Sequence, residues 1–118
     1  MQRRQLLQAG LAVAATTPTW SRADTWPAKP ITLVVPFPPG GSTDLIARAL
    51  STKMAEKLGP GFTFIVDNKA GATGTIGAAQ VVRSAPDGHT LFVSSLGPFV
   101  IAPHLTKVTY DATKDLDY

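Results

Sequence analysis

The sequence contains no cysteine, which excludes disulfide bonds and thiolate metal ligands. Only two histidines are present, His89 after a turn and His104 in a stretch without periodicity, and we expect both to be exposed. The motifs HExxH and GxSxG are missing. Asp67 and Asn68 end an apolar run, where a strand-end turn explains them better than an active site. The sequence therefore predicts no catalytic residue, no metal site and no cofactor.

No apolar run reaches the roughly 20 residues that a membrane span needs. The run from Leu6 to Ala15 follows Arg3 and Arg4 and precedes "SRA", so residues 1–23 are predicted to be a cleaved signal peptide. An ordinary amphipathic first helix is the alternative. The paired arginines leave both the Sec and the twin-arginine export routes open. We expect a periplasmic protein that does not itself span the membrane.

The predicted mature chain also lacks net charge. The full sequence has 11 basic and 8 acidic residues. Removal of Arg3, Arg4 and Arg22 leaves eight basic residues against eight acidic ones. A basic field that would attract nucleic acid is therefore not expected, and no nucleic-acid partner is predicted.

Three short apolar runs predict strands, and two helical patterns lie between them. Nearly continuous apolar runs suit strands that are buried on both faces of a parallel sheet. The expected strands are 31–37, 62–68 and 90–95. The expected core stripe of the first helix comprises Ile46, Leu50, Met54 and Leu58, with Leu45 and Ala49 beside it. The second helix, about 75–84, is expected to turn Ala78, Val81, Val82 and Ala85 to one side.

This β-α-β-α-β order with short connections is typical of an open α/β sheet. Sheets usually contain about four to six strands, and the stretch after Pro98 shows no clear period. We therefore expect residues 24–118 to be the N-terminal part of a first domain, in a truncated copy of a longer protein.

Glycine-rich or hydroxyl-rich loops follow all three expected strands: "PFPPGGST", "NKAGATGT" and "SSLG". Neither glycine loop fits a nucleotide motif, because "PPGGST" lacks the Walker lysine and "GATGTIG" is not GxGxxG. Backbone N–H groups and the positive ends of helix dipoles nevertheless favour an anion there. Each loop alone is explained by a capped turn, with Ser42 or Thr43 as the expected cap of the first helix. Three such loops at one sheet edge predict a site for a small anion, with Asp44 stabilising the helix start.

Four stretches resemble one family: "WPAKPITLVVPFPPGGSTDLIARAL", "VDNKAGATGTIGA", "SAPDGHTLFVSS" and "YDATKDL". They resemble the Bug family, the solute-binding receptors of tripartite tricarboxylate transporters, from Trp26 to about Leu116. The resemblance implies a type II periplasmic-binding-protein fold, of which only the first β-α-β-α-β part of domain one is present. It also implies a small carboxylate or related organic solute as ligand and membrane permease subunits as partners.

The resemblance places the family's ligand loops on the loops already singled out. Thr73 stands where glycine is frequent in the family, and Lys69 stands where arginine is common. The predicted ligand-binding residues are Phe37, Pro38, Pro39, Gly40, Gly41, Ser42, Thr43, Gly71, Ala72, Thr73, Gly74, Thr75, Ser94 and Ser95. An exported α/β enzyme of hydrolase type and a non-functional truncated fragment are the alternative functions.

Overall fold

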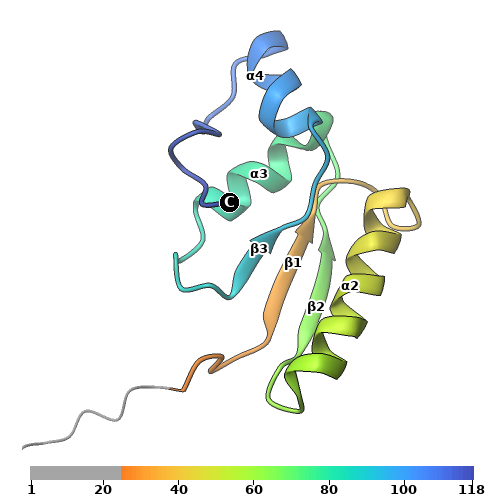
Figure 1. Cartoon of the computed structure of the whole chain (residues 1–118). Coiled ribbons are helices and arrows are strands. Elements are labelled where there is room, and N and C mark those ends of the chain that lie inside the picture. The colour runs from red at the N-terminus through yellow and green to blue at the C-terminus, as the bar shows by residue number, and fades with distance from the viewer. Residues whose placement is uncertain (1–24) are drawn as a thin grey trace, which may run out of the picture.

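The computed structural model of the protein describes residues 25–118, so the predicted signal peptide lies outside the described residues. The predicted β-α-β-α-β order is confirmed (Figure 1). The elements are β1 (Ile31–Val35), α2 (Ser42–Leu58), β2 (Phe64–Asn68), α3 (Thr75–Val82) and β3 (Thr90–Phe92), followed by a π-helical turn (Gly97–Ile101) and α4 (Ala102–Leu105). None of the helices within residues 25–118 has the length and apolar character that a membrane span requires.

The three strands form a parallel sheet in the order β2-β1-β3. The central strand is buried on both faces, since Ile31, Leu33, Val34 and Val35 are each at most 2% exposed. β1 ends at Val35, two residues earlier than predicted, where Pro36 lacks the N–H group that would continue the ladder. The α/β class is confirmed, with β1 forming the centre of the core.

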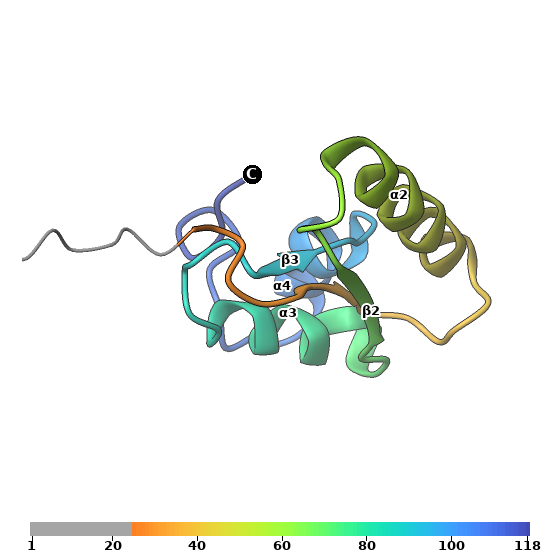
Figure 2. The same cartoon turned by 90° about the horizontal axis from the view of Figure 1, so that it is seen from below.

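The two long helices lie on opposite faces of the sheet (Figure 2). α2 packs on β2 and β1, whereas α3 packs on β3 and β1. Each helix therefore covers only part of one face. Ile65 of β2 and Leu91 of β3 remain 49% and 39% exposed, so the two outer strands are less covered than the central one.

The predicted core stripe of α2 is wrong for most of its members. Ile46, Leu50 and Leu58 are 61%, 45% and 49% exposed, whereas Asp44 and Ala47 are buried. Ile46 follows Asp44 by two residues and so lies about 200° around the helix from it, which places the start of the row outside the buried face. The buried face starts instead at Asp44, whose carboxylate has its hydrogen-bond partners on the inner side of the helix.

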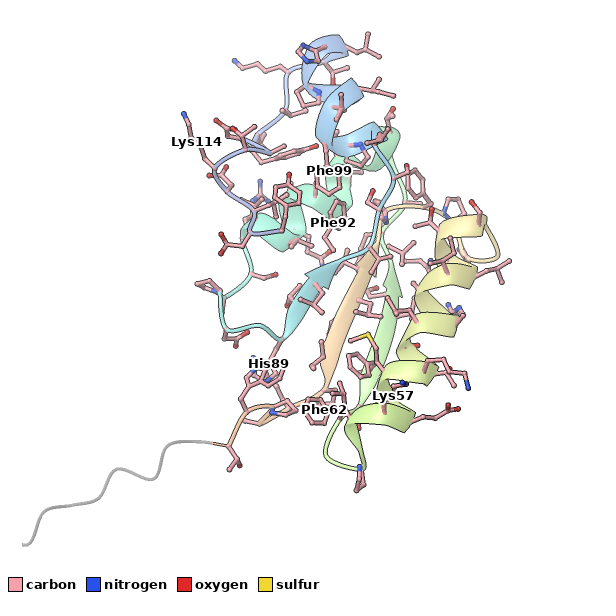
Figure 3. All side chains as sticks on the ribbon, in the orientation of Figure 1. Lys57, Phe62, His89, Phe92, Phe99 and Lys114 are labelled. Atoms are coloured by element: carbon pink, nitrogen blue, oxygen red, sulfur yellow. The ribbon has the colours of Figure 1, made fainter. Side chains whose placement is uncertain are left out.

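The segment after Pro98, which showed no period in the sequence, folds back onto α3. Tyr110 and Ala112 are buried with Ala78, and Phe92 and Phe99 pack against this cluster. The Phe92 and Phe99 rings lie 5.2 Å apart in an edge-to-face arrangement (Figure 3). The Tyr110 hydroxyl donates to the Pro98 carbonyl, and burial raises the pKa of this tyrosine. The stretch is thus part of the core within the described chain.

His89 is also not where the sequence predicted it, because it is only 7% exposed. It lies at the start of β3 (Figure 3), where its Nε2 accepts a hydrogen bond of 3.2 Å from the Ala28 N–H. The indole N–H of Trp26 donates to the Asp87 carbonyl at 3.0 Å. His89 therefore attaches the segment before β1 to the opposite end of the sheet from the predicted ligand loops. His104 is exposed as expected.

Candidate functional site

The candidate site lies at the carboxyl edge of the sheet, where a loop leaves each parallel strand. The loops span residues 36–41, 69–74 and 93–96. Figure 1 shows that they gather at the end of the sheet where α2 begins. Ligand crevices of open α/β sheets form at this edge.

The first loop supplies backbone donors. Gly41 is the N-cap of α2 with an ordinary φ of −75°, and no side chain caps the helix. Ser42 and Thr43 lie inside the helix, so the expectation that one of them is the cap is wrong. The first helical hydrogen bond runs from the Leu45 N–H to the Gly41 carbonyl. The N–H groups of the preceding helical residues have no partner within the helix and are available to a ligand.

The buried side chain of Asp44 stabilises this loop through hydrogen bonds. It is 2% exposed, and its Oδ2 accepts hydrogen bonds from the Gly40 N–H at 2.9 Å and from Arg48 Nε at 3.0 Å. Its Oδ1 accepts a bond of 2.9 Å from Asn68 Nδ2. The bonds from Arg48, Gly40 and Asn68 lower the pKa of Asp44 from 3.8 to about 2. Its charge is therefore matched by local donors.

An open pocket of about 330 Å³ lies at the start of α2. It brings residues of the first loop and helix together with a residue of the third loop. Among the described residues, those that line it carry no charge: Phe37, Gly41, Ser42, Thr43 and Ser95. Pro38, Pro39 and Gly40 are exposed beside it, and the Ser94 hydroxyl donates to the Ser95 carbonyl at 3.2 Å. The pocket can therefore offer hydroxyl and backbone dipoles to a small polar group.

The second loop lies next to the third but does not line this pocket. Four consecutive residues have positive φ: Gly71 at 138°, Ala72 at 45°, Thr73 at 58° and Gly74 at 88°. For a branched residue such as Thr73 this conformation costs about 1–2 kcal/mol. The Thr75 hydroxyl donates to the Ala72 carbonyl at 3.0 Å. A Cβ placed on Gly97 would lie 3.7 Å from the Thr73 carbonyl oxygen, so the second loop lies against the π-helical turn that directly follows the third loop.

Gly74 is placed for packing. It is buried, and a Cβ there would lie 2.5 Å from Pro98 Cγ and 3.2 Å from Pro36 Cβ. A bulky residue at this position would disturb the fold before it could block a ligand. Gly41 differs, because a Cβ there meets only the Pro38 carbonyl oxygen, at 3.5 Å. Gly41 is consequently the better position at which to test ligand binding.

A larger cavity of about 480 Å³ lies under the C-terminal segment, between β3 and the end of α3. Its lining is mainly apolar and includes Val82, Phe92 and Phe99, together with the carboxylates of Asp115 and Asp117. Two carboxylates disfavour an anion, so this cavity does not fit the predicted ligand. No three His, Asp or Glu side chains in residues 25–118 lie close enough to hold a metal ion.

Asn68 is a structural residue of the site that the sequence did not reveal. Its Nδ2 donates to the Phe37 carbonyl at 3.1 Å as well as to Asp44, and its Oδ1 accepts from an Arg48 NH2 group at 3.2 Å. The sequence indicated only a polar residue at a strand end. The parallel register, which pairs Asn68 with Val35, brings it beside the first loop.

The family described as the tripartite tricarboxylate transporter family receptor (TctC) matches residues 46–118, which is more than half of the chain. The chain belongs to this receptor family. Among its curated relatives, BugT of Bordetella pertussis (strain Tohama I) is 45% identical over 96 residues, which cover 80% of this chain and 29% of BugT. The resemblance of this TctC-family chain to the Bug proteins is confirmed.

Solved structures agree with this membership and with the periplasmic-binding-protein fold. MatC (Rpa3494) from Rhodopseudomonas palustris with bound malate has a TM-score of 0.70 and 43% identity, covering 76% of this TctC-family chain and 30% of MatC. Rpa4515 from R. palustris with adipate has a TM-score of 0.52 and 40% identity, covering 57% and 22%. The chain spans about a third of the length of the curated relatives it matches.

Proposed function

We propose that this chain forms one side of the ligand site in a periplasmic receptor that binds a small carboxylate. The receptor would deliver this solute to the membrane permease subunits of a tripartite tricarboxylate transporter. Residues 1–23 are proposed to be the export signal, and residues 24–118 the N-terminal part of the first domain. Family membership supports the receptor class, and the malate and adipate in two similar structures support the ligand class.

The observation that carries this proposal is the uncharged pocket at the N-terminus of α2. A carboxylate there would accept hydrogen bonds from the free N–H groups of the first helical turn. The positive end of the helix dipole favours the same charge. The hydroxyls of Ser42, Thr43 and Ser95 add neutral donors. A second domain closing over this edge would bury the rest of the ligand, as in other two-domain binding proteins.

The second loop enters the proposal as a support for the third loop and as a further ligand contact. Ala72 and Thr73 are exposed beside the third loop. All four residues 71–74 have positive φ, and the Gly74 N–H is bonded to the Gly71 carbonyl, which leaves the N–H groups of Ala72 and Thr73 as the donors for a ligand. We propose that a ligand larger than one carboxylate group extends from the pocket toward these residues.

Thermal unfolding with a panel of carboxylates tests the proposal. At a ligand concentration of 100 Kd the stabilisation is about 2.7 kcal/mol, which raises Tm by roughly 10 °C or more for a domain of this size. Malate and adipate belong in the panel. Gly41→Leu should abolish the shift because its side chain enters the pocket.

Gly61→Leu is the matched control, since a Cβ at Gly61 meets nothing within 4 Å. It should keep the full shift. An unchanged Tm across the whole panel for the wild-type chain would argue against the proposed function. Equal shifts in Gly41→Leu and wild type would place the ligand elsewhere.

A further inference from the structure

The first loop is held at two points by groups that do not line the pocket. The Phe37 carbonyl accepts a hydrogen bond from Asn68, and the Gly40 N–H donates to Asp44. We call the pair Asp44 and Asn68, joined by their own bond of 2.9 Å, the Asp44–Asn68 brace. It connects the end of β2, the first turn of α2 and the loop after β1.

All side-chain polar atoms of the brace are hydrogen-bonded within the protein. One N–H of the Asn68 amide reaches Phe37 and the other reaches Asp44, while its oxygen accepts from Arg48. Both oxygens of Asp44 are likewise bonded. Arg48 contacts both members, so its positive charge offsets the buried carboxylate. A carboxylate so matched does not repel an anion as strongly as a free one would.

The brace also decides which backbone donors of the loop remain free. Pro38 and Pro39 have no N–H, and the Gly40 N–H is already bonded to Asp44. The next donors in the chain are the N–H groups of Gly41, Ser42 and Thr43, and all three residues line the pocket. The hydrogen-bonded groups of the loop therefore contact Asp44 and Asn68, whereas its free N–H groups belong to residues that line the pocket.

We propose that Asp44 and Asn68 are positioning residues for ligand binding, holding residues 37–43 so that the free N–H groups converge on one carboxylate. This inference rests on the proposed function, because it assumes a carboxylate in that pocket. Neither residue would touch the ligand. Loss of either side chain would leave the residues that line the pocket unchanged in identity, but their N–H groups would no longer be held in one arrangement.

Hydrogen exchange without ligand tests the structural half of this inference. In the full chain, Asn68→Ala removes the two amide donors, and Asp44→Ala removes the acceptor of the Gly40 N–H. We expect exchange of the Gly40 amide to accelerate at least tenfold relative to that of Val34 in the central strand. If the ratio of Gly40 to Val34 exchange rates is unchanged in both variants, the inference that Asp44 and Asn68 order the loop is wrong. If Asp44→Ala does not fold, Asn68→Ala alone decides.

Calorimetric titration with malate and with adipate tests the functional half. We expect Asn68→Ala to raise Kd at least tenfold, whereas Asp67→Ala should stay within twofold of wild type. Asp67 is a suitable control because it is the preceding residue of β2 and pairs only with Lys69, at 3.4 Å. Faster Gly40 exchange with an unchanged Kd would overturn the positioning role.

The two measurements separate failure of the inference from failure of the proposed function. If wild type binds neither acid, the proposed function fails for these ligands and the positioning role fails with it. The exchange ratio then still decides whether the brace orders the loop. If wild type binds and Asn68→Ala binds with the same affinity, the proposed function stands and the positioning role is wrong.

Discussion

Asp44 illustrates how a single buried charge organises the edge of the sheet. Burying a carboxylate is costly unless hydrogen-bonded groups replace the water that it loses. Here the Gly40 N–H, the Arg48 guanidinium and the Asn68 amide supply three donors. Its position in the first turn of a helix adds the favourable dipole. An acid that could have repelled an anionic ligand instead stabilises the loop beside it.

Gly41 and Gly74, in the two predicted glycine-rich ligand loops, are required for different structural reasons. Gly41 has open space around it and ordinary φ, so its lack of a side chain keeps the pocket accessible. Gly74 has a positive φ of 88° and lies against Pro36 and Pro98. Only glycine fits the second position without strain, because both the backbone conformation and the neighbouring atoms exclude a Cβ.

Gly74→Ala should therefore lower the free energy of unfolding by about 2–4 kcal/mol, as the sum of left-handed strain and overpacking. Urea unfolding followed by circular dichroism measures the change. Gly61→Ala is the control and should change stability by no more than about 1 kcal/mol, since its Cβ meets open space. Equal stability of Gly74→Ala and wild type would contradict the packing of the second loop.

At the scale of elements, hydrogen bonds to acidic side chains connect segments far apart in the chain. Asp44 links α2 to the end of β2 through Asn68. Asp87, in the turn before β3, accepts a bond of 3.0 Å from the His89 N–H and pairs with Lys29 at 3.1 Å. Its bond to the His89 N–H, followed by its contact with Lys29, lowers the pKa of Asp87 from 3.8 to about 2. The two carboxylates thus secure opposite ends of the sheet.

These pKa values predict how stability depends on pH. Because the pKa of both carboxyls is about 2 in the folded chain and 3.8 ordinarily, the unfolded chain binds more protons between these values. Stability from both groups is complete above about pH 5 and is lost progressively as the pH falls toward 2. Thermal unfolding between pH 2 and pH 6 should show this fall. Asp87→Asn should be less stable at pH 6 and should show a shallower fall; an unchanged slope would exclude a contribution from Asp87.

At the scale of the whole described molecule, the C-terminal segment completes one part of the core and leaves other parts open. Tyr110 and Ala112 cover α3, while Leu45, Ile46 and Leu50 of α2 face outward with 59%, 61% and 45% exposure. The larger cavity lies beneath the same C-terminal segment. The stability of the described fold consequently depends on how firmly this segment is attached.

Tyr110→Phe tests that attachment. It removes the hydroxyl that donates to the buried Pro98 carbonyl, and should cost about 1–2 kcal/mol because the carbonyl loses its partner away from water. Tyr118→Phe is the matched control, since the Tyr118 hydroxyl also donates to a carbonyl, that of Ala112, but its residue is 87% exposed. It should cost less than about 0.5 kcal/mol. Denaturant unfolding compares them, and similar losses would argue against a buried anchor at Tyr110.

Local pattern was sufficient to predict the order of elements and the parallel α/β class, whereas the family was predicted from the resemblance of four stretches to known receptors. Apolar runs, helix breaks and turn residues act over a few neighbouring positions, so they can be read along the chain. The same holds for the loops at strand ends, because parallel strands present their carboxyl ends at one edge. Packing of the C-terminal segment was not predictable in this way, since Tyr110 and Ala112 make their contacts without any periodic pattern.

The sequence alone thus predicted which segments form the sheet edge, and it predicted a small anion as the ligand there. Tertiary structure decided which face of α2 is buried, which loops share the pocket and why Gly74 must be glycine. It also joined Asn68 to Phe37, 31 residues away in the chain. Such choices depend on hydrogen bonds and packing between distant segments. Their partners exist only after the strands have taken their register, so no local pattern encodes them.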